Sequence, residues 1–133
     1  MDLEEFFSRL NAGETNFAGV DLRGVCLIRS DLRDINLSGV DLRNADLTDV
    51  DLARVNLTGA NLSGAILLNA NLEYVILIGA DLSGADLDGT GFENADLSNA
   101  NLRNAIIGNV RDAILCNTIL PNGRISNDGC GRG

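Results

Sequence analysis

The stretch that decides the fold is residues 40–64, which read VDLRN ADLTD VDLAR VNLTG ANLSG in blocks of five. Each block places a small or β-branched residue, an acid or amide, a central leucine, a variable residue and a corner residue in that order. The pattern extends in both directions without a change of register. Its central position is filled by Phe17, Leu22, Leu27, Leu32, Leu37, Leu42, Leu47, Leu52, Leu57, Leu62, Leu67, Leu72, Leu77, Leu82, Leu87, Phe92, Leu97, Leu102 and Ile107.

A period of five fits neither an α-helix, which repeats every 3.6 residues, nor an uninterrupted strand, which repeats every 2. It fits a short extended edge followed by a turn. Alternate side chains of an extended edge share a face. The central residue and the residue two before it therefore point inward, and the acid or amide between them points outward. The sequence predicts an all-β solenoid made of short edges.

The corner residue is Gly or Asn in most repeats, as expected where the backbone φ is positive. The exceptions are Arg29, Asp34, Asp49, Arg54 and Tyr74. We sort the repeats into four faces of twenty-residue period, with the first face centred on Phe17, and all five exceptions then fall on the third and fourth faces. We predict four edges per coil, with type II turns at two corners and ordinary turn geometry that tolerates a Cβ at the other two.

This tandem pattern closely resembles the pentapeptide repeat proteins. The resemblance implies a right-handed quadrilateral (square) β-helix, here of about five coils within residues 15–120. The stretch Leu10–Phe17 also resembles the opening of small cyanobacterial members. Some members of the family dimerise through aromatic residues at the carboxyl end. The last aromatic residue here is Phe92, so we expect a monomer or a weak dimer.

Both ends of the solenoid are expected to differ from its middle, within a single domain of residues 1–133. Leu3, Phe6, Phe7 and Leu10 recur at helical spacing, and Asp2 with Glu5 resembles a capping box. Residues 2–11 are therefore predicted to form a short helix that covers the first coil. At the other end we interpret residues 110–112 as three added residues, and we expect the Gly-rich residues 121–133 to form a mobile tail.

Composition disfavours several classes of function. The formal net charge is −9, with no His, and an acidic surface argues against direct binding to nucleic acid or to an anionic membrane. General acid–base catalysis most often uses His, and the Cys residues have no metal-ligand spacing. We therefore expect no catalytic residue, metal or cofactor. Residues 1–5 lack the features of a signal peptide, so we expect a cytoplasmic protein.

The main candidate site is a set of apolar residues at outward positions. All fall on the third face and are named the third-face patch: Cys26, Ile28, Ile66, Leu68 and Ile106. Contiguous apolar surface usually marks an interaction site, although Asp46, Asp86 and Asp88 interrupt this one. Cover by the tail, or relaxed β-propensity, would also account for apolar residues there. Ile76 and Ile78 make a smaller pair on the first face. The patch favours a non-enzymatic scaffold or interaction module with an unknown protein partner.

The alternative, which the family resemblance suggests, is an acidic DNA mimic that inhibits a topoisomerase-type DNA-binding enzyme. Between residues 15 and 109 thirteen acids and six bases give −13 + 6 = −7. This is about −1.5 per ~4.8 Å coil, against nearly three charges for the same length of duplex DNA. A mimic would thus have about half the charge density of DNA. One feature favours it, because residues 55–102 contain six acids and no base.

The three cysteines receive separate interpretations. Cys26 occupies an outward position and is interpreted as a surface thiol. Cys116 and Cys130 flank the last turn and the tail, and they are the candidate disulfide, which would hold the tail over the open end. Reduction in the cytosol argues against such a bond.

Overall fold

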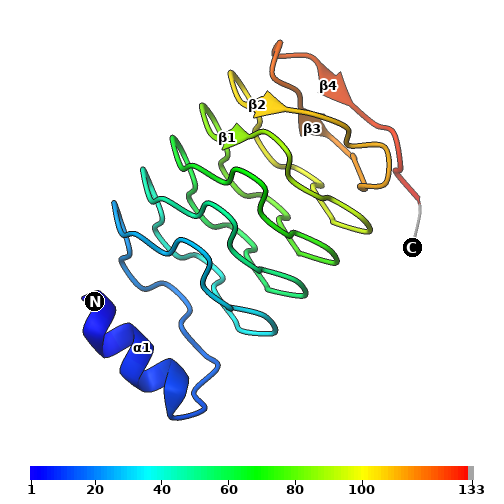
Figure 1. The fold of residues 1–133 in the computed structure, drawn as a ribbon. Coiled ribbons are helices and arrows are strands. Elements are labelled where there is room, and N and C mark those ends of the chain that lie inside the picture. Colours follow the sequence, from blue (N-terminus) through cyan, green and yellow to red (C-terminus); the bar gives the residue numbers. More distant parts are fainter. Residues whose placement is uncertain (132–133) are drawn as a thin grey trace.

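The computed structural model describes residues 1–131 and forms a rod of stacked coils, with a helix at one end and a hairpin at the other (Figure 1). Parallel bridges join residues twenty apart, such as Asn16 with Asn36 and Asn36 with Asn56. This spacing is the one that four edges of five residues per coil require. The edges are so short that only Asp86–Leu87 (β1) and Ile106–Ile107 (β2) form a parallel strand pair.

Successive coils are joined by backbone hydrogen bonds on every face. The Leu22 N–H donates to the Asp41 carbonyl at 2.8 Å, and the Asp41 N–H donates back to the Val20 carbonyl at 3.0 Å. Each edge therefore binds the edge above it and the edge below it. A solenoid held in this way has stability that accumulates coil by coil.

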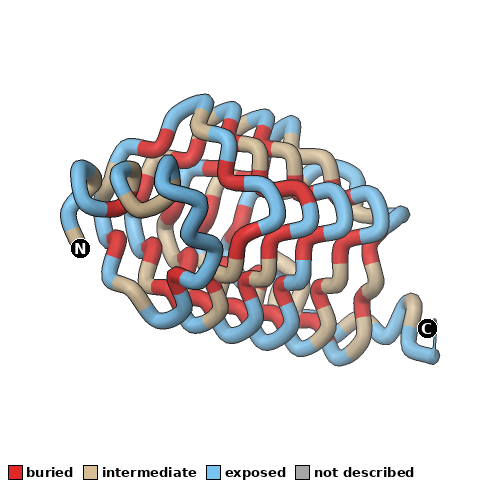
Figure 2. Tube along the Cα trace, turned by 90° about the horizontal axis from the view of Figure 1, so that it is seen from below, coloured by how far each residue is buried: buried red, intermediate tan, exposed pale blue. Residues whose placement is uncertain are grey.

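The core is a column of inward-pointing central residues that runs along the rod (Figure 2). No central residue between Phe17 and Leu102 is more than 3% exposed. The small residues two positions before them, such as Ala65 and Ala85, are fully buried and leave room for the leucines. Burial of each leucine contributes roughly 1.5–3 kcal/mol, offset by the entropy of ordering the chain.

The corners differ from the sequence prediction. Ordinary turn geometry was expected at the non-glycine corners, but those residues also have positive φ, between 57° and 65°: Arg29, Asp34, Asp49, Arg54 and Tyr74. All four corners therefore use the left-handed conformation. It costs a residue with a Cβ about 1–2 kcal/mol. The ladder holds it in place, since the Tyr74 N–H donates to the Glu93 carbonyl at 2.9 Å.

A helix covers the first coil. α1 spans Leu3–Asn11, and its N-cap is Asp2, whose Oδ1 accepts from the Glu5 N–H at 2.8 Å. Phe6 is fully buried, and its ring lies 4.8 Å from the ring of Phe17, the first central residue. The helix thus removes the apolar end of the column from water.

The last coil is shorter than the others. Asp96 pairs with Ile114 and Asn101 with Ile119, a separation of eighteen residues instead of twenty. The interpretation of three added residues was therefore wrong, because two residues are missing. The Ala113 N–H donates to the Val110 carbonyl at 3.0 Å, as at the other corners. Val110 thus takes a central position only three residues after Ile107.

The carboxyl-terminal segment also differs from the expected mobile tail. β3 (Thr118–Ile119) pairs antiparallel with β4 (Ile125–Ser126), which folds the chain back over the last coil. The Leu115 N–H then donates to the Asp128 carbonyl at 2.8 Å. The segment is ordered through residue 131 because the last coil offers ladder groups that no further coil pairs. Residues 132–133 of the expected tail lie outside the described part of the chain.

Candidate functional site

The third-face patch lies on a ladder that runs along one side of the rod. Parallel bridges join Cys26 to Asp46, Asp46 to Ile66 and Ile66 to Asp86. The β1–β2 pair extends this ladder from Asp86 to Ile106. The twenty-residue period therefore brings the outward residues of the patch onto one face, in alternate coils.

Each coil contributes one row to the third face, made of the outward residues before and after the centre. The rows alternate in chemistry along the rod: Cys26 and Ile28, Asp46 and Thr48, Ile66 and Leu68, Asp86 and Asp88, then Ile106 and Gly108. Ile28, Ile66 and Ile106 are 41%, 37% and 58% exposed, and Leu68 is half-buried. The described tail leaves these side chains open to solvent.

The residue before each centre also has a local role that the sequence patterns did not reveal. When it is Asp or Asn, its Oδ1 accepts from the backbone N–H two residues later. In this way Asn61 bonds the Ser63 N–H at 3.0 Å, and Asp86 bonds the Asp88 N–H at 3.1 Å. Such side-chain bonds to nearby backbone stabilise turns. The preference for Asp and Asn at this position is therefore a preference for a hydrogen bond, and not only for a polar surface.

The third face gives up this bond more often than any other face. Its residues before the centre include Cys26, Ile66 and Ile106, and an isoleucine offers no oxygen to the N–H two residues later. The first face gives it up once before the shortened last coil, at Ile76. The apolar residues of the third face thus replace side chains that would have stabilised the fold locally.

A second, smaller apolar site lies on the first face and its neighbouring corner. Ile76 and Ile78 are 38% and 36% exposed, and Tyr74 at the preceding corner is 53% exposed. Sequence reasoning identified the isoleucine pair but not Tyr74, because corner positions were interpreted only as turn residues. This site is confined to one coil, whereas the third-face patch recurs along the rod.

Charges are paired in the coils nearest the amino end. Arg23 binds Asp21 through two hydrogen bonds of 2.9 and 2.6 Å, and Arg33 binds Asp31 in the same way. The side-chain hydrogen bond from Arg23 is the main reason that the pKa of Asp21 falls to about 2, and the Arg23 backbone N–H adds to it. The Asp31 pKa is also about 2, chiefly because of Arg33. These pairs are solvent-exposed.

The arginine pairs bear on the DNA-mimic alternative. The ion pairs of the described residues all lie between Arg9 and Arg54. The acids of that half are therefore largely neutralised, and the acids without a base lie within residues 55–102. The surface is not a continuous negative rod, and this distribution does not favour a mimic of duplex DNA.

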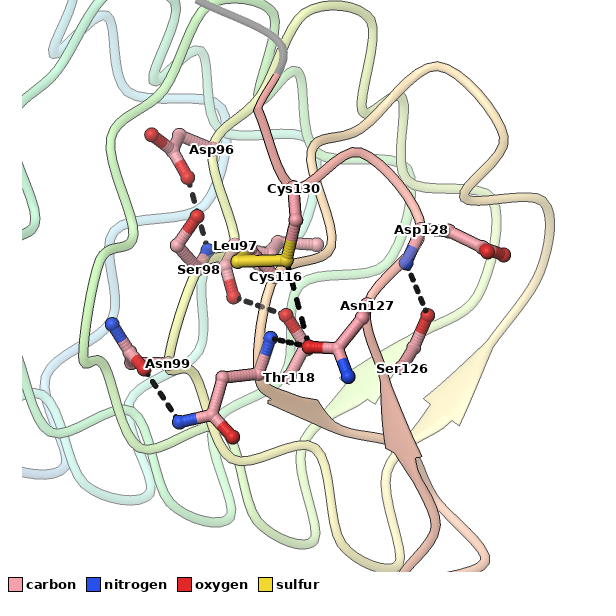
Figure 3. Close-up of a disulfide and its surroundings, with 11 residues drawn as sticks. Asp96, Leu97, Ser98, Asn99, Cys116, Thr118, Ser126, Asn127, Asp128 and Cys130 are labelled. Carbon is pink, nitrogen blue, oxygen red and sulfur yellow. Dashed lines mark hydrogen bonds between the residues drawn. A yellow bond between two sulfur atoms is a disulfide. The ribbon is translucent and has the colours of Figure 1, made fainter.

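The carboxyl-terminal hairpin is held by a covalent bond and by several side chains (Figure 3). Cys116 and Cys130 form a disulfide. Asn127 Oδ1 accepts from the Asn117 N–H at 2.9 Å. The Thr118 hydroxyl, which is fully buried, donates to the Leu97 carbonyl at 2.7 Å. Cys26 is an exposed free thiol.

Neither a reactive cluster nor a membrane span is found within residues 1–131. No group of three or more Cys, Asp or Glu side chains there is arranged to hold a metal ion. A hollow of about 370 Å³ beside the last coil brings together one base and one acid, Arg111 and Asp128. Over the same residues, no helix has the length and apolar character needed to cross a bilayer.

The coils, corners and repeat pattern define a class of protein, the quadrilateral β-helices. A family model described as "Pentapeptide repeats (8 copies)" matches residues 7–39, 35–67 and 65–104. The chain therefore belongs to the pentapeptide repeat family, whose members fold as right-handed quadrilateral β-helices and generally act as non-enzymatic structural or interaction modules. No curated protein matches the chain.

Solved structures support the assignment. A pentapeptide repeat protein from Nostoc Pcc 7120 is 30% identical with a TM-score of 0.70, over 74% of this chain and 79% of that one. A pentapeptide repeat protein of the Arabidopsis thaliana thylakoid lumen is 27% identical with a TM-score of 0.54, over 86% of this chain and 70% of that one. QnrB1, a fluoroquinolone resistance protein, is 17% identical with a TM-score of 0.34 over 86% of this chain and 78% of that one, so it transfers no function.

Proposed function

We propose that this protein is a non-enzymatic repeat scaffold that binds a protein partner through the third-face patch. One observation carries the proposal. At three of the five positions before the third-face centres, an apolar residue or a cysteine replaces the Asp or Asn that would bond the backbone. A hydrogen bond of this kind contributes about 0.5–1.5 kcal/mol. Exposed apolar side chains that replace it support a role in binding.

The proposal includes the state and location of the protein. We propose a right-handed stack of about five coils, working as a monomer or weak dimer in the cytoplasm. Direct binding to nucleic acid or to a membrane is not part of it, because the net charge of −9 repels phosphates. The DNA mimic is not proposed, since arginines pair with the acids of the amino-terminal half.

Affinity capture from the native host tests the proposal when it compares three forms of the protein. The unaltered protein should capture a stoichiometric partner. The Ile66→Ser/Leu68→Ser variant should lose it, and the Ile76→Ser/Ile78→Ser variant on the first face should retain it. Urea unfolding of each variant shows whether the coils remain intact. Loss of the partner only in the first-face variant would overturn the third-face assignment.

A further inference from the structure

We propose that the third-face patch binds an amphipathic, basic α-helix that lies obliquely across the coils. This inference names the class of partner and rests on the contact function proposed above. It draws on three features of the face: the spacing of its apolar rows, their diagonal arrangement, and the acids between them.

The spacing of the rows favours a helix over a strand. Coils in a parallel ladder lie ~4.8 Å apart, so apolar rows in alternate coils are ~9.6 Å apart. Seven residues of a helix, two turns, advance ~10.5 Å and return to the same side. In a strand, side chains of one face recur every ~6.7 Å, and three residues span ~10 Å but end on the opposite face. Only the helix repeats near the period of this face.

The small mismatch in length defines a tilt. A helix inclined by about 24° to the rod axis projects its ~10.5 Å repeat onto ~9.6 Å. Over fourteen residues the same tilt shifts the helix sideways by ~8.5 Å. The patch has such a diagonal, because Ile28 follows its centre, Ile66 and Leu68 flank theirs, and Ile106 precedes its own. The lateral step between those two positions is ~6.6 Å, two residues of extended chain.

The charge of the face favours basic residues on the partner. Asp46, Asp86 and Asp88 fill the rows between the apolar rows, and none of them has an ion-pair partner among the described residues. The third-face repeats, residues 25–29, 45–49, 65–69, 85–89 and 105–109, contain four acids and one base, a net of 1 − 4 = −3. That base, Arg29, lies at a corner 3.8 Å from Asp49. Residues three and four after each apolar contact of a bound helix would face the acidic rows.

The occupant is another protein and not a second copy of this chain. α1 is the one helix within residues 1–131, and its first turn carries Glu4 and Glu5. These acids would meet the acids of the third face. Its apolar side is also already in use, because Phe6 is fully buried against the first coil.

A defined peptide tests the inference with the folded protein. The probe is a labelled 18-residue peptide with Leu at positions 1, 8 and 15, Lys at 4, 5, 11 and 12, and Ala elsewhere. We expect saturable binding by fluorescence anisotropy, at least tenfold weaker for the Ile66→Ser/Leu68→Ser variant and unchanged for Ile76→Ser/Ile78→Ser. Asp86→Asn/Asp88→Asn should weaken binding and flatten its dependence on salt. The amide oxygen introduced by Asp86→Asn can still accept from the backbone N–H of residue 88, so folding is retained.

Two control peptides complete the test. One has the same composition with Leu at positions 1, 6 and 11, and the other has Glu in place of Lys; both should bind at least tenfold more weakly. Equal binding of either control, or indifference to Ile66→Ser/Leu68→Ser, would overturn the helix proposal. If no peptide binds while capture from the host still depends on Ile66 and Leu68, the helix is wrong and the contact function stands. If capture does not depend on those two residues, the contact function itself is wrong.

Discussion

Ile66 and Asp86 are direct neighbours in the parallel ladder of the third face, yet only Asp86 completes the hydrogen bond that its position offers. Its Oδ1 accepts from the Asp88 N–H at 3.1 Å, whereas the isoleucine side chain has no acceptor for the Leu68 N–H. Ile66 is also 37% exposed. The fold therefore does not require an isoleucine there, and surface function can be tested separately from stability.

We predict that Ile66→Asn leaves the free energy of unfolding unchanged or raises it by up to about 1 kcal/mol, because the new amide oxygen can bond the Leu68 N–H. Urea denaturation measures the effect. Asn61→Ala is the matched change in the opposite direction, since it removes the bond to the Ser63 N–H. It should lower stability by about 0.5–1.5 kcal/mol. A large loss with Ile66→Asn would show instead that Ile66 belongs to the core.

A second prediction concerns the corners. Tyr74 has φ 58° and Gly79 has φ 69°, so the two corners share a conformation that favours glycine. Gly79→Ala should lower the free energy of unfolding by about 1–2 kcal/mol. Tyr74→Gly should leave it unchanged or raise it by up to about 1 kcal/mol, because relief of strain is partly offset by the flexibility of glycine in the unfolded chain. Equal tolerance of alanine at both positions would contradict the left-handed corner geometry.

The sequence predicted the repeating parts of this fold better than its exceptions. Nineteen central residues in one register define the core, and the segregation of corner residues favoured a twenty-residue period that matches the ladder. The positive φ of Arg29 and Tyr74 could not be predicted from residue preference, because ladder bonds from neighbouring coils impose it. The hydrogen bonds of residues such as Asn61 were missed for a related reason, since outward polarity alone explains Asp and Asn.

The carboxyl end was the least predictable part. A shift of the pattern after Ile107 is compatible with three added or two missing residues, and only the pairing of Asp96 with Ile114 decides between them. The hairpin of β3 and β4 depends on free ladder groups at the last coil, which no local pattern encodes. On the candidate site, the period placed the third-face patch on one face, but the alternation of its rows with hydrogen-bonded acids needed the structure.

The arginine pairs give a prediction about pH. The pKa of Asp21 is about 2 because Arg23 bonds its ionised form. A lowered pKa means that this carboxylate stabilises the fold above its unfolded pKa near 3.8, and that the contribution is lost as the pH falls toward 2. NMR titration of the Asp21 carboxyl carbon should show the low pKa, and Arg23→Gln should raise it. Arg33→Gln, on another face, should leave Asp21 unchanged; a normal pKa in the unaltered protein would contradict the pair.

The disulfide gives a prediction about the end of the rod. Cys116 and Cys130 are fourteen residues apart, and closing a loop of that length stabilises by about 3 kcal/mol. Reduction, or Cys116→Ser/Cys130→Ser, should increase amide hydrogen exchange in residues 117–131. Exchange of the middle coils should not change, because each coil contacts mainly its neighbours. Alkylation with mass mapping verifies the thiol state, and equal protection of the hairpin in both states would contradict the prediction.

Site-specific photo-crosslinking in the native host tests the central claim most directly. A photoreactive amino acid is placed at position 68 on the third face or at position 78 on the first face, both of which follow a buried central residue. We expect a discrete crosslinked protein from position 68 that is absent from position 78 and disappears when Ile66→Asn is added. A crosslink from position 78 alone, or one from position 68 that survives Ile66→Asn, would contradict the assignment of the third face as the contact surface.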